Sequence, residues 1–421
     1  MQATHTKNPF DYLGLDPILL RAVYGLGYEA PTPIQKEAIP AILTDRDVIG
    51  TAQTGSGKTA AFVLPILHRL LKQSPGRTRA LILSPTRELA AQIEVALRGL
   101  AKGTKIRGHA VYGGVGMAAQ EHALRSGVDV VVATPGRLLD HMSRRNVDFR
   151  GLQVLVLDEA DRMLDMGFLP DVRRIVDALP RDRQTLLFAA TMPPEIEGLS
   201  RSIMRNPVRI AVSPPYRPPP TIRHEVFPVP QHLKTALLVR LLGREDMMSV
   251  LVFVRTKRRA DRVARQAGQA GFDVARMHGD RSQSQRETAL AGFRSGRHQV
   301  LIATDVAARG IDVEGISHVI NYDVPTVPTD YVHRVGRTAR MEAEGDAITF
   351  VAPEEETDVR RIEKALGKAI PRVTLPDFDY RAPPPPRVHP PEGGRHPQSR
   401  RASGRRDSRR GPPPRRRKDH R

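Results

Sequence analysis

Short apolar runs alternate with longer amphipathic stretches through the first half of the chain. Each run ends in a small or polar cluster, and the stretches between them have the length of helices, as in residues 60–70. This alternation predicts a parallel sheet with crossover helices. The expected strands are 47–49, 80–83, 128–132, 154–157 and 185–188.

The same alternation returns in the second half. Between the halves, five prolines fall within residues 213–220, and such a segment forms neither a helix nor a central strand. We therefore expect an α/β protein with two parallel-sheet domains, whose cleft can close on a ligand. The second set of strands is expected at 249–254, 273–277, 299–303, 318–321 and 347–351, with helices at 258–270 and 284–294. The expected divisions are domain one at 1–212, a linker at 213–221, domain two at 222–376 and a tail at 377–421.

The net charge of +20 is concentrated at the C-terminal end of the 421 residues. Residues 381–421 hold 14 Lys and Arg against 3 Asp and Glu, with ten prolines and almost no apolar side chains. Such a segment cannot bury enough surface to offset its ordering entropy, so we expect disorder and contact with nucleic acid. A solubilising tail is the alternative. The chain has no cysteine and no apolar run of about 18 residues, so we expect no disulfide, no membrane span and a cytoplasmic location.

A glycine-rich loop follows the first predicted strand. Its sequence resembles the phosphate-binding pattern G-x-x-x-x-G-K-[ST], with Ala52 at the first glycine position. Its glycines let backbone N–H groups approach phosphate oxygens, while Lys58 would neutralise the terminal phosphates and Thr59 would coordinate Mg²⁺. The following helix adds its N-terminal dipole. The expected ATP-binding residues of this loop are Ala52, Gln53, Thr54, Gly55, Ser56, Gly57, Lys58 and Thr59.

An acidic pair follows the strand predicted at 154–157. In open α/β sheets, ligands bind at the carboxyl ends of the strands, where Asp158 and Glu159 are expected. Asp158 would hold Mg²⁺, and Glu159 would orient and deprotonate the attacking water. The alternative is that both side chains cap the next helix. Together with Lys58, the pair favours hydrolysis of a nucleoside triphosphate.

Residues 158–161 spell Asp-Glu-Ala-Asp, and the chain resembles the DEAD-box RNA helicases over about residues 8–375. The segment 27–35 looks like the family's adenine-reading Q motif, and Phe10 matches its isolated aromatic residue. The Gln35 amide has a donor and an acceptor that can pair with adenine, whereas Phe10 also fits a core anchor. The resemblance implies two tandem RecA-like domains, and the chain is most similar to the bacterial RhlE-type subgroup.

The family's RNA-facing motifs occur in order in both halves. Their hydroxyls, backbone amides and arginines suit contacts to phosphate and 2′-OH groups, and none is an obvious base reader. The resemblance therefore implies a sequence-independent grip on the RNA backbone, with Gln283 and Arg286 in a further motif. The implied RNA-binding residues are Pro85, Thr86, Arg87, Gly114, Thr134, Pro135, Gly136, Arg137, Arg255, Gly279 and Thr304.

Arg337 and Arg340 lie three positions apart, so on a helix they would share one face. Considered alone, such a pair is usually a solvated basic face. The resemblance implies instead that the two arginines reach the γ-phosphate, and that Asp312 contacts the nucleotide ribose. The expected catalytic residues are then Glu159, Lys58, Arg337 and Arg340.

The family's Ser-Ala-Thr motif reads Ala189-Ala190-Thr191 here. In the family, the serine hydroxyl helps to tie Asp161 to the His333 region and to link hydrolysis with duplex opening. The loss of one hydrogen bond is worth roughly 1 kcal/mol. Our hypothesis is that the protein hydrolyses ATP normally and unwinds weakly, with Asp161, Ala189, Thr191 and His333 as coupling residues.

The favoured function is ATP-dependent RNA remodelling, with ATP and Mg²⁺ as cofactors and single-stranded RNA or short duplexes as partners. The family also suggests ribosomal or RNA-decay proteins as partners. Two alternatives remain open: a DNA helicase built on the same core, and an RNA-annealing scaffold that works through the arginine-rich tail. ATP hydrolysis that is stimulated by RNA and not by DNA would exclude the DNA helicase. Strand annealing by a Glu159→Gln variant would support the annealing scaffold.

Overall fold

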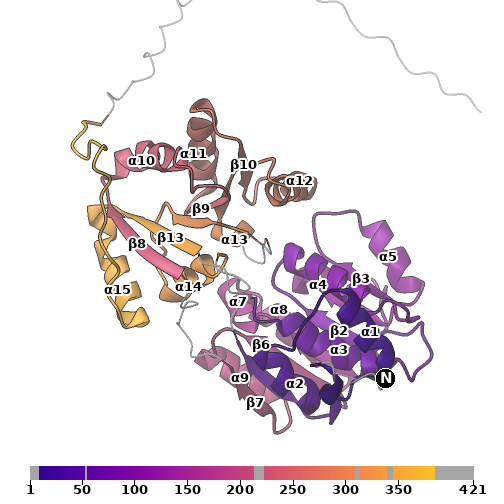
Figure 1. The fold of residues 1–421 in the computed structure, drawn as a ribbon. Helices are drawn as coiled ribbons and strands as arrows, with labels where there is room; N and C mark the ends of the chain where they lie inside the picture. Colours follow the sequence, from indigo (N-terminus) through magenta and orange to yellow (C-terminus); the bar gives the residue numbers. More distant parts are fainter. Residues whose placement is uncertain are drawn as a thin grey trace, which may run out of the picture. The chain divides into compact units, whose positions relative to one another are not determined.

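The computed structural model describes residues 9–52, 55–212, 222–308, 313, 315–338 and 345–384. The linker predicted at 213–221 and the chain from residue 385 onward lie outside these residues. Two parallel β-sheets organise the described chain, one in each half of the sequence (Figure 1). Helices flank both sheets, which confirms the predicted α/β class with two parallel-sheet domains.

The first sheet has seven strands in the order β3-β4-β2-β5-β6-β1-β7, and its pairings are parallel. The five predicted runs correspond to its central strands. The apolar pattern does not reveal β3 and β7, because these edge strands are only partly buried and their side chains form no continuous apolar run. The strands are β1 (Val48–Thr51), β2 (Ala80–Leu83), β3 (Gly108–Val111), β4 (Val130–Ala133), β5 (Val154–Leu157), β6 (Gln184–Ala189) and β7 (Val208–Ala211).

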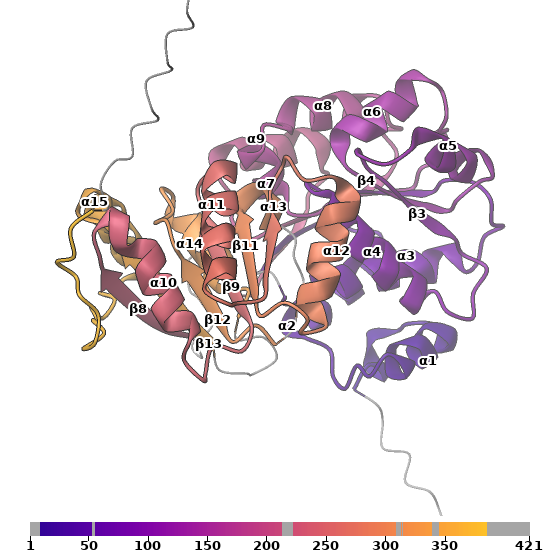
Figure 2. The ribbon, with the colours of Figure 1, turned by 90° about the horizontal axis from the view of Figure 1, so that it is seen from above.

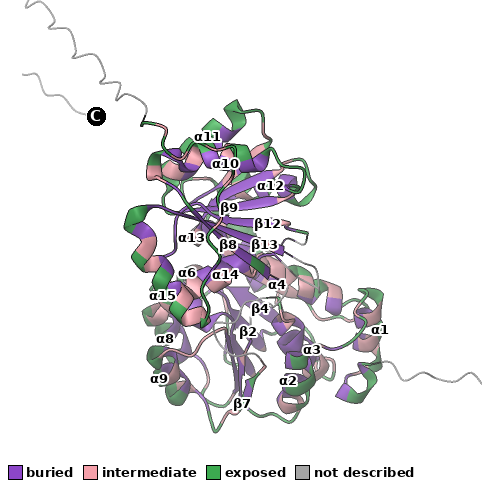
Figure 3. Ribbon diagram, turned by 60° about the vertical axis from the view of Figure 1, so that its left-hand side comes forward, coloured by how far each residue is buried: buried purple, intermediate pink, exposed green. Residues whose placement is uncertain are grey.

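The helices of the first half divide between the two faces of this sheet. Apolar side chains of the first four helices pack on one face, around Phe62 and Phe188, and those of the next five pack on the other. Figure 3 shows the buried strands between half-exposed helices. The helices are α1 (Pro17–Gly25), α2 (Pro33–Leu43), α3 (Lys58–Leu70), α4 (Arg87–Leu100), α5 (Met117–Arg125), α6 (Pro135–Ser143), α7 (Ala160–Asp165), α8 (Leu169–Asp177) and α9 (Pro194–Ile203).

The second sheet has six parallel strands in the order β10-β11-β9-β12-β13-β8. Five match predicted runs, whereas β8 was not expected because His224 and Glu225 interrupt its apolar positions. Helices α10 and α11 lie side by side against this sheet (Figures 1 and 2). The strands are β8 (Ile222–Pro228), β9 (Val250–Val254), β10 (Val274–Met277), β11 (Val300–Thr304), β12 (His318–Asn321) and β13 (Gly345–Val351). The helices are α10 (Lys234–Leu242), α11 (Lys257–Gln269), α12 (Gln283–Arg294), α13 (Asp305–Ala308), α14 (Pro328–Val335) and α15 (Glu356–Leu366).

The chain beyond α15 continues to pack on the second half of the protein. Leu375, Phe378 and Tyr380 are partly buried against the apolar cluster that holds α10 and α11. The compact unit ends at Ala382, so residues 377–382, which the sequence assigns to the tail, belong to it. Within the described residues, no helix is both long and apolar enough to cross a membrane.

Candidate active site

The phosphate-binding loop lies between β1 and α3. Gly55 and Gly57 both adopt positive φ angles, 83° and 89°, which glycine reaches without a Cβ clash. Helix α3 begins at Lys58, whose buried Nζ donates a hydrogen bond to the Ala52 carbonyl, 2.6 Å away. The lysine therefore points back over the loop. Of the remaining loop residues named by the sequence, Ser56 and Thr59 are half-buried, in the loop and in the first turn of α3, whereas Gln53 and Thr54 lie outside the described residues.

Gln35 joins the predicted adenine-binding motif to this loop. Its Oε1 accepts the Thr32 N–H at 2.9 Å, and its Nε2 donates to the Gly57 carbonyl at 3.1 Å. A Cβ on residue 57 would lie 2.5 Å from Gln35 Nε2, so the loop needs glycine there for space as well as for its backbone angle. An amide has two N–H donors and two lone pairs, so Gln35 retains one of each for a base.

Phe10 is fully buried in the apolar cluster of the first four helices. Its ring meets Tyr24 edge-on, with centroids 6.1 Å apart, and lies 6.3 Å from the tilted ring of Tyr28. The structure thus gives Phe10 the position of a core anchor. Its stacking near adenine stays a prediction.

The acidic pair follows β5 at the carboxyl end of the first sheet. Asp158 is buried and accepts the Glu159 N–H at 3.0 Å. Burial raises the pKa of Asp158 to about 7, although the positive charge of Lys58 acts in the opposite direction. The loop and the strand end predicted to hold the nucleotide are therefore close enough to interact electrostatically.

Glu159 stands at the N-cap of α7 in a left-handed conformation, with φ 51° and ψ 52°. A residue with a Cβ pays roughly 1 kcal/mol for this conformation. Its side chain makes no capping hydrogen bond, which removes the alternative that it caps the helix. Glu159 Oε2 lies 3.4 Å from Arg162 Nε, and both side chains are buried. Sequence reasoning missed Arg162, although its spacing of three residues from Glu159 is the signal of a helical ion pair.

Asp161 is anchored to the segment that follows β6. Its Oδ2 accepts the N–H of Ala190 at 3.1 Å, the N–H of Thr191 at 2.8 Å and the Thr191 hydroxyl at 3.0 Å. Ala189, the last residue of β6, is fully buried beside them. Three donors from residues 190 and 191 therefore hold Asp161 without a hydroxyl at position 189.

The structure places Arg337 beyond the end of a helix, and a common face with Arg340 stays a prediction. Helix α14 ends at Val335, and Arg337 lies in the turn that follows. The N–H groups of Arg337 and Thr338 close this turn by donating to the carbonyls of Arg334 and Val335, each at 3.1 Å, and the Thr338 hydroxyl donates to the Ile316 carbonyl. Arg340, together with Asp312, lies outside the described residues.

Arg337 is nevertheless close to the acidic strand end. Its side chain is buried, and burial lowers its pKa to about 10; the charge of Arg162 acts in the same direction and that of Glu159 opposes it. Arg337, Arg162 and His333 line one small cavity. The structure thus brings Arg337 into the electrostatic range of Glu159.

Three RNA-facing motifs of the first half converge. A Cβ on Gly114, where φ is 85°, would lie 1.9 Å from Arg87 Nη1, so the glycine makes room for that guanidinium. Arg137 donates to the Val115 carbonyl at 3.2 Å and to Gln120 Oε1 at 3.3 Å. The remaining predicted residues stand at helix starts: Thr86 and Thr134 are the N-caps of α4 and α6, and Pro85, Pro135 and Gly136 adjoin them.

The motifs of the second half also follow strands. Arg255 comes after β9, and Thr304 is the last residue of β11. Lys257 covers Gly279, because a Cβ there would lie 3.2 Å from the lysine Cε. A separate contact joins α4 and α12, where Glu88 pairs with Arg286 at 2.8 Å.

Comparison with known proteins identifies two matching domain families. Residues 32–199 match the DEAD/DEAH box helicase family, and residues 233–342 match the helicase conserved C-terminal domain. The chain is 44% identical over 377 residues to the ATP-dependent RNA helicase DeaD of Buchnera aphidicola, covering 89% of this chain and 62% of that protein. It is 42% identical over 370 residues to the ATP-dependent RNA helicase CshA of Listeria monocytogenes, covering 88% of this chain and 71% of that protein.

The chain belongs to the DEAD-box helicase family. It spans less than two thirds of the DeaD relatives' length. Among solved DEAD-box structures, S. cerevisiae Dbp5 bound to RNA and ADP BeF3 matches with a TM-score of 0.80 and 33% identity, over 87% of this chain and 95% of that chain. Mss116p bound to ssRNA and AMP-PNP matches with a TM-score of 0.79 and 28% identity, over 86% and 78% of the two chains. These matches support the RecA-like assignment of both halves, whereas membership of the RhlE-type subgroup stays a prediction.

Proposed function

We propose that this DEAD-box protein is an RNA-dependent ATPase that binds RNA through its backbone and locally opens short duplexes. One observation carries the proposal. Asp158, buried at the end of β5, interacts electrostatically with the lysine of the phosphate-binding loop, and the same tetrapeptide is anchored through Asp161 to the segment after β6. The residues after β5 would therefore both help to bind the nucleotide and connect it to the motif at residues 189–191.

The chemistry needs a base, positive charge and an ordered water. Glu159 supplies the carboxylate that orients and deprotonates the attacking water. Lys58 neutralises the phosphates, and Arg337 and Arg340 stabilise the charge of the transferred phosphoryl group. Gln35 selects adenine while its Nε2 holds the loop carbonyl at Gly57.

Thr59 and Asp158 would hold Mg²⁺. Hydroxyl and carboxylate oxygens are its preferred donors, and the high pKa of the buried Asp158 fits a carboxylate that gains from a nearby cation. Within the described residues, no group of three or more acidic, histidine or cysteine side chains is placed to hold a metal ion. The ion would neutralise charge on the phosphate oxygens.

We further propose the domain divisions at 212 and 221 given by the sequence, with the second domain continuing to Ala382 and the basic chain beyond it acting as a non-specific RNA tether. The RNA contacts would come from the convergent motifs around Arg87, Gly114 and Arg137, and from Arg255, Gly279 and Thr304. A cytoplasmic location and ribosomal or RNA-decay partners fit this activity.

The deciding experiment measures ATP hydrolysis with RNA, with DNA of the same sequence and with no nucleic acid. We expect stimulation by RNA alone, together with ATP-dependent separation of a short RNA duplex. Equal stimulation by DNA would contradict the RNA assignment and favour a DNA helicase.

The second candidate, an annealing scaffold, is favoured by the 14 basic residues within 381–421. Because the compact unit ends at Ala382, the matched truncation removes residues 383–421. Loss of RNA affinity with intact RNA-stimulated ATPase per bound complex would identify the tail as a tether. Annealing that persists in Glu159→Gln and disappears on truncation would support the scaffold.

A further inference from the structure

Lys234 is a fully buried lysine in the second half of the protein, at the first position of α10. Its Nζ donates to the carbonyls of Tyr322, at 2.9 Å, and Phe350, at 3.1 Å, and it also contacts the carboxylate of Glu355. An ammonium has three N–H donors, so this side chain is fully satisfied. It ties the start of α10 to the ends of β12 and β13.

Glu355 extends this network toward solvent. It belongs to the short 3₁₀ helix η3 (Pro353–Glu355), and its side chain is 7% exposed. Its Oε2 accepts the Ala352 N–H at 3.0 Å, and its Oε1 accepts the Val324 N–H at 3.4 Å. The carboxylate is therefore fixed by main-chain donors as well as by Lys234.

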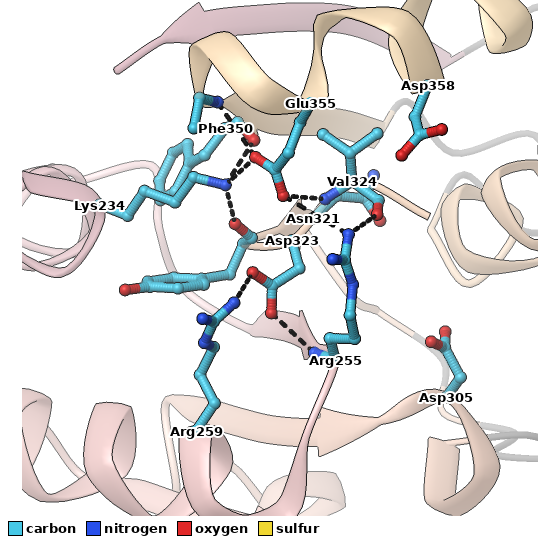
Figure 4. A network of polar contacts seen from close by, with 12 residues as sticks. Lys234, Arg255, Arg259, Asp305, Asn321, Asp323, Val324, Phe350, Glu355 and Asp358 are labelled. Carbon is cyan, nitrogen blue, oxygen red and sulfur yellow. Dashed lines mark hydrogen bonds and ion pairs between the residues drawn. The ribbon is translucent and has the colours of Figure 1, made fainter. Parts of the chain in front are cut away.

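Arg255 is held by two carboxylates at once (Figure 4). Asp323 Oδ2 accepts its backbone N–H at 2.7 Å, and Asp323 also pairs with Arg259. The Arg255 guanidinium donates from Nη2 to the Val324 carbonyl at 3.0 Å, and Nη2 lies 3.6 Å from Glu355 Oε1. One edge of the guanidinium is thus fixed, while 47% of the side chain remains exposed.

We propose that Glu355, itself held by Lys234, is a positioning residue that orients Arg255 for its contact with the RNA backbone. The proposal rests on the proposed function, because Arg255 is a predicted RNA contact. An arginine fixed along one edge presents the other edge in a single orientation, so less side-chain freedom is lost when a phosphate binds. Lys234 places a positive charge directly beside the buried Glu355 carboxylate and so holds it in position.

The test is Glu355→Gln in the full-length protein, with ATP hydrolysis measured against RNA concentration. The variant keeps the shape and acceptor of the side chain and removes its charge. We expect the KM for RNA to rise about five- to tenfold, with kcat at saturating RNA and the KM for ATP close to wild type. Glu356→Gln is the matched control, since the neighbouring Glu356 pairs with Arg360 and Arg372 instead.

A double-mutant cycle shows whether Glu355 acts through Arg255. In an Arg255→Ala background, Glu355→Gln is expected to cause no further change in the KM for RNA. Arg255→Lys, which keeps the charge and loses the guanidinium whose Nη2 contacts Val324 and Glu355, is expected to raise that KM as well. An unchanged KM in Glu355→Gln or Arg255→Lys, or additive effects in the cycle, would overturn the positioning role alone. Lack of RNA stimulation in the wild-type protein would overturn the proposed function together with it.

Discussion

Buried carboxylates follow strands in both sheets, but their partners differ. After β5, burial dominates the environment of Asp158 and raises its pKa to about 7, with Lys58 only partly offsetting it. After β12, Asp323 holds Arg255 and Arg259, and Glu355 holds Lys234. The second region balances its charges with its own side chains, whereas the first leaves a carboxylate whose pKa is raised by burial.

This difference separates two uses of a buried charge. A carboxylate that is saturated by fixed cations makes a rigid support, because moving any member leaves another unpaired. A carboxylate with an unbalanced environment responds to a ligand that brings positive charge. The first sheet thus carries the groups proposed for chemistry, and the second carries a frame that holds a proposed RNA contact.

The largest effect is expected for Glu159→Gln, which removes the proposed base. We expect RNA-stimulated kcat to fall by about 10²- to 10⁴-fold, with ATP affinity retained. Steady-state hydrolysis and binding of a fluorescent ATP analogue measure the two quantities. A loss below tenfold would show that the acidic pair is not the chemical centre and would break the comparison.

Lys234→Met tests the frame itself. Removing one member of a buried ion pair leaves the other charge unpaired, so we expect the free energy of unfolding, measured in urea, to fall by about 3–5 kcal/mol. Lys257→Met is the control, because Lys257 and its partner Asp280 are exposed, and little change is expected there. Similar stability of the two variants would remove the distinction between the regions.

His224 offers a pH test of a buried group without a buried counter-charge. Burial lowers its pKa from 6.5 to about 4, and its Nδ1 lies 2.8 Å from the Tyr331 hydroxyl. Between these pH values the unfolded chain binds the extra proton, so stability present above pH 6.5 is lost as the pH falls toward 4, by up to about 3 kcal/mol. Thermal unfolding of His224→Asn should show a flatter pH dependence than wild type, while the exposed His122→Asn should match wild type. If the thermal stability of His224→Asn changed with pH as steeply as that of the wild-type protein, the argument from burial would be contradicted.

Ala189→Ser is expected to have the smallest effect. A restored hydroxyl would add one donor beside Asp161, worth roughly 1 kcal/mol, so strand separation per ATP should rise by no more than about fivefold. Duplex unwinding and ATP hydrolysis measured in the same reaction give this ratio. If it does not rise, the three donors from residues 190 and 191 already provide the link, and the hypothesis of weak unwinding fails.

The residues proposed for the chemistry could be placed from the sequence because the central strands are continuous apolar runs, so the residues after them could be assigned to one edge of a sheet. Edge strands such as β3 were not predicted, because they are only partly buried and their sequences do not form a continuous apolar run. The end of α14 before Arg337 could not be foreseen, since the helical spacing of the two arginines carries no signal of where the helix stops, and the contact of Thr338 with Ile316 appears only in the fold. Lys234 and Glu355 are 121 residues apart, and each resembles an ordinary surface charge until the fold buries both.

The left-handed backbone of Glu159 is a strained conformation that the charges around it keep in place. Asparagine or glycine adopts this conformation more readily, and either replacement would relieve roughly 1 kcal/mol of backbone strain. Either replacement would also remove the carboxylate that lies 3.4 Å from the buried Arg162 guanidinium, and losing one member of a buried ion pair costs about 3–5 kcal/mol. A search for heat-resistant variants, even one that did not select for ATP hydrolysis, would therefore retain the proposed base.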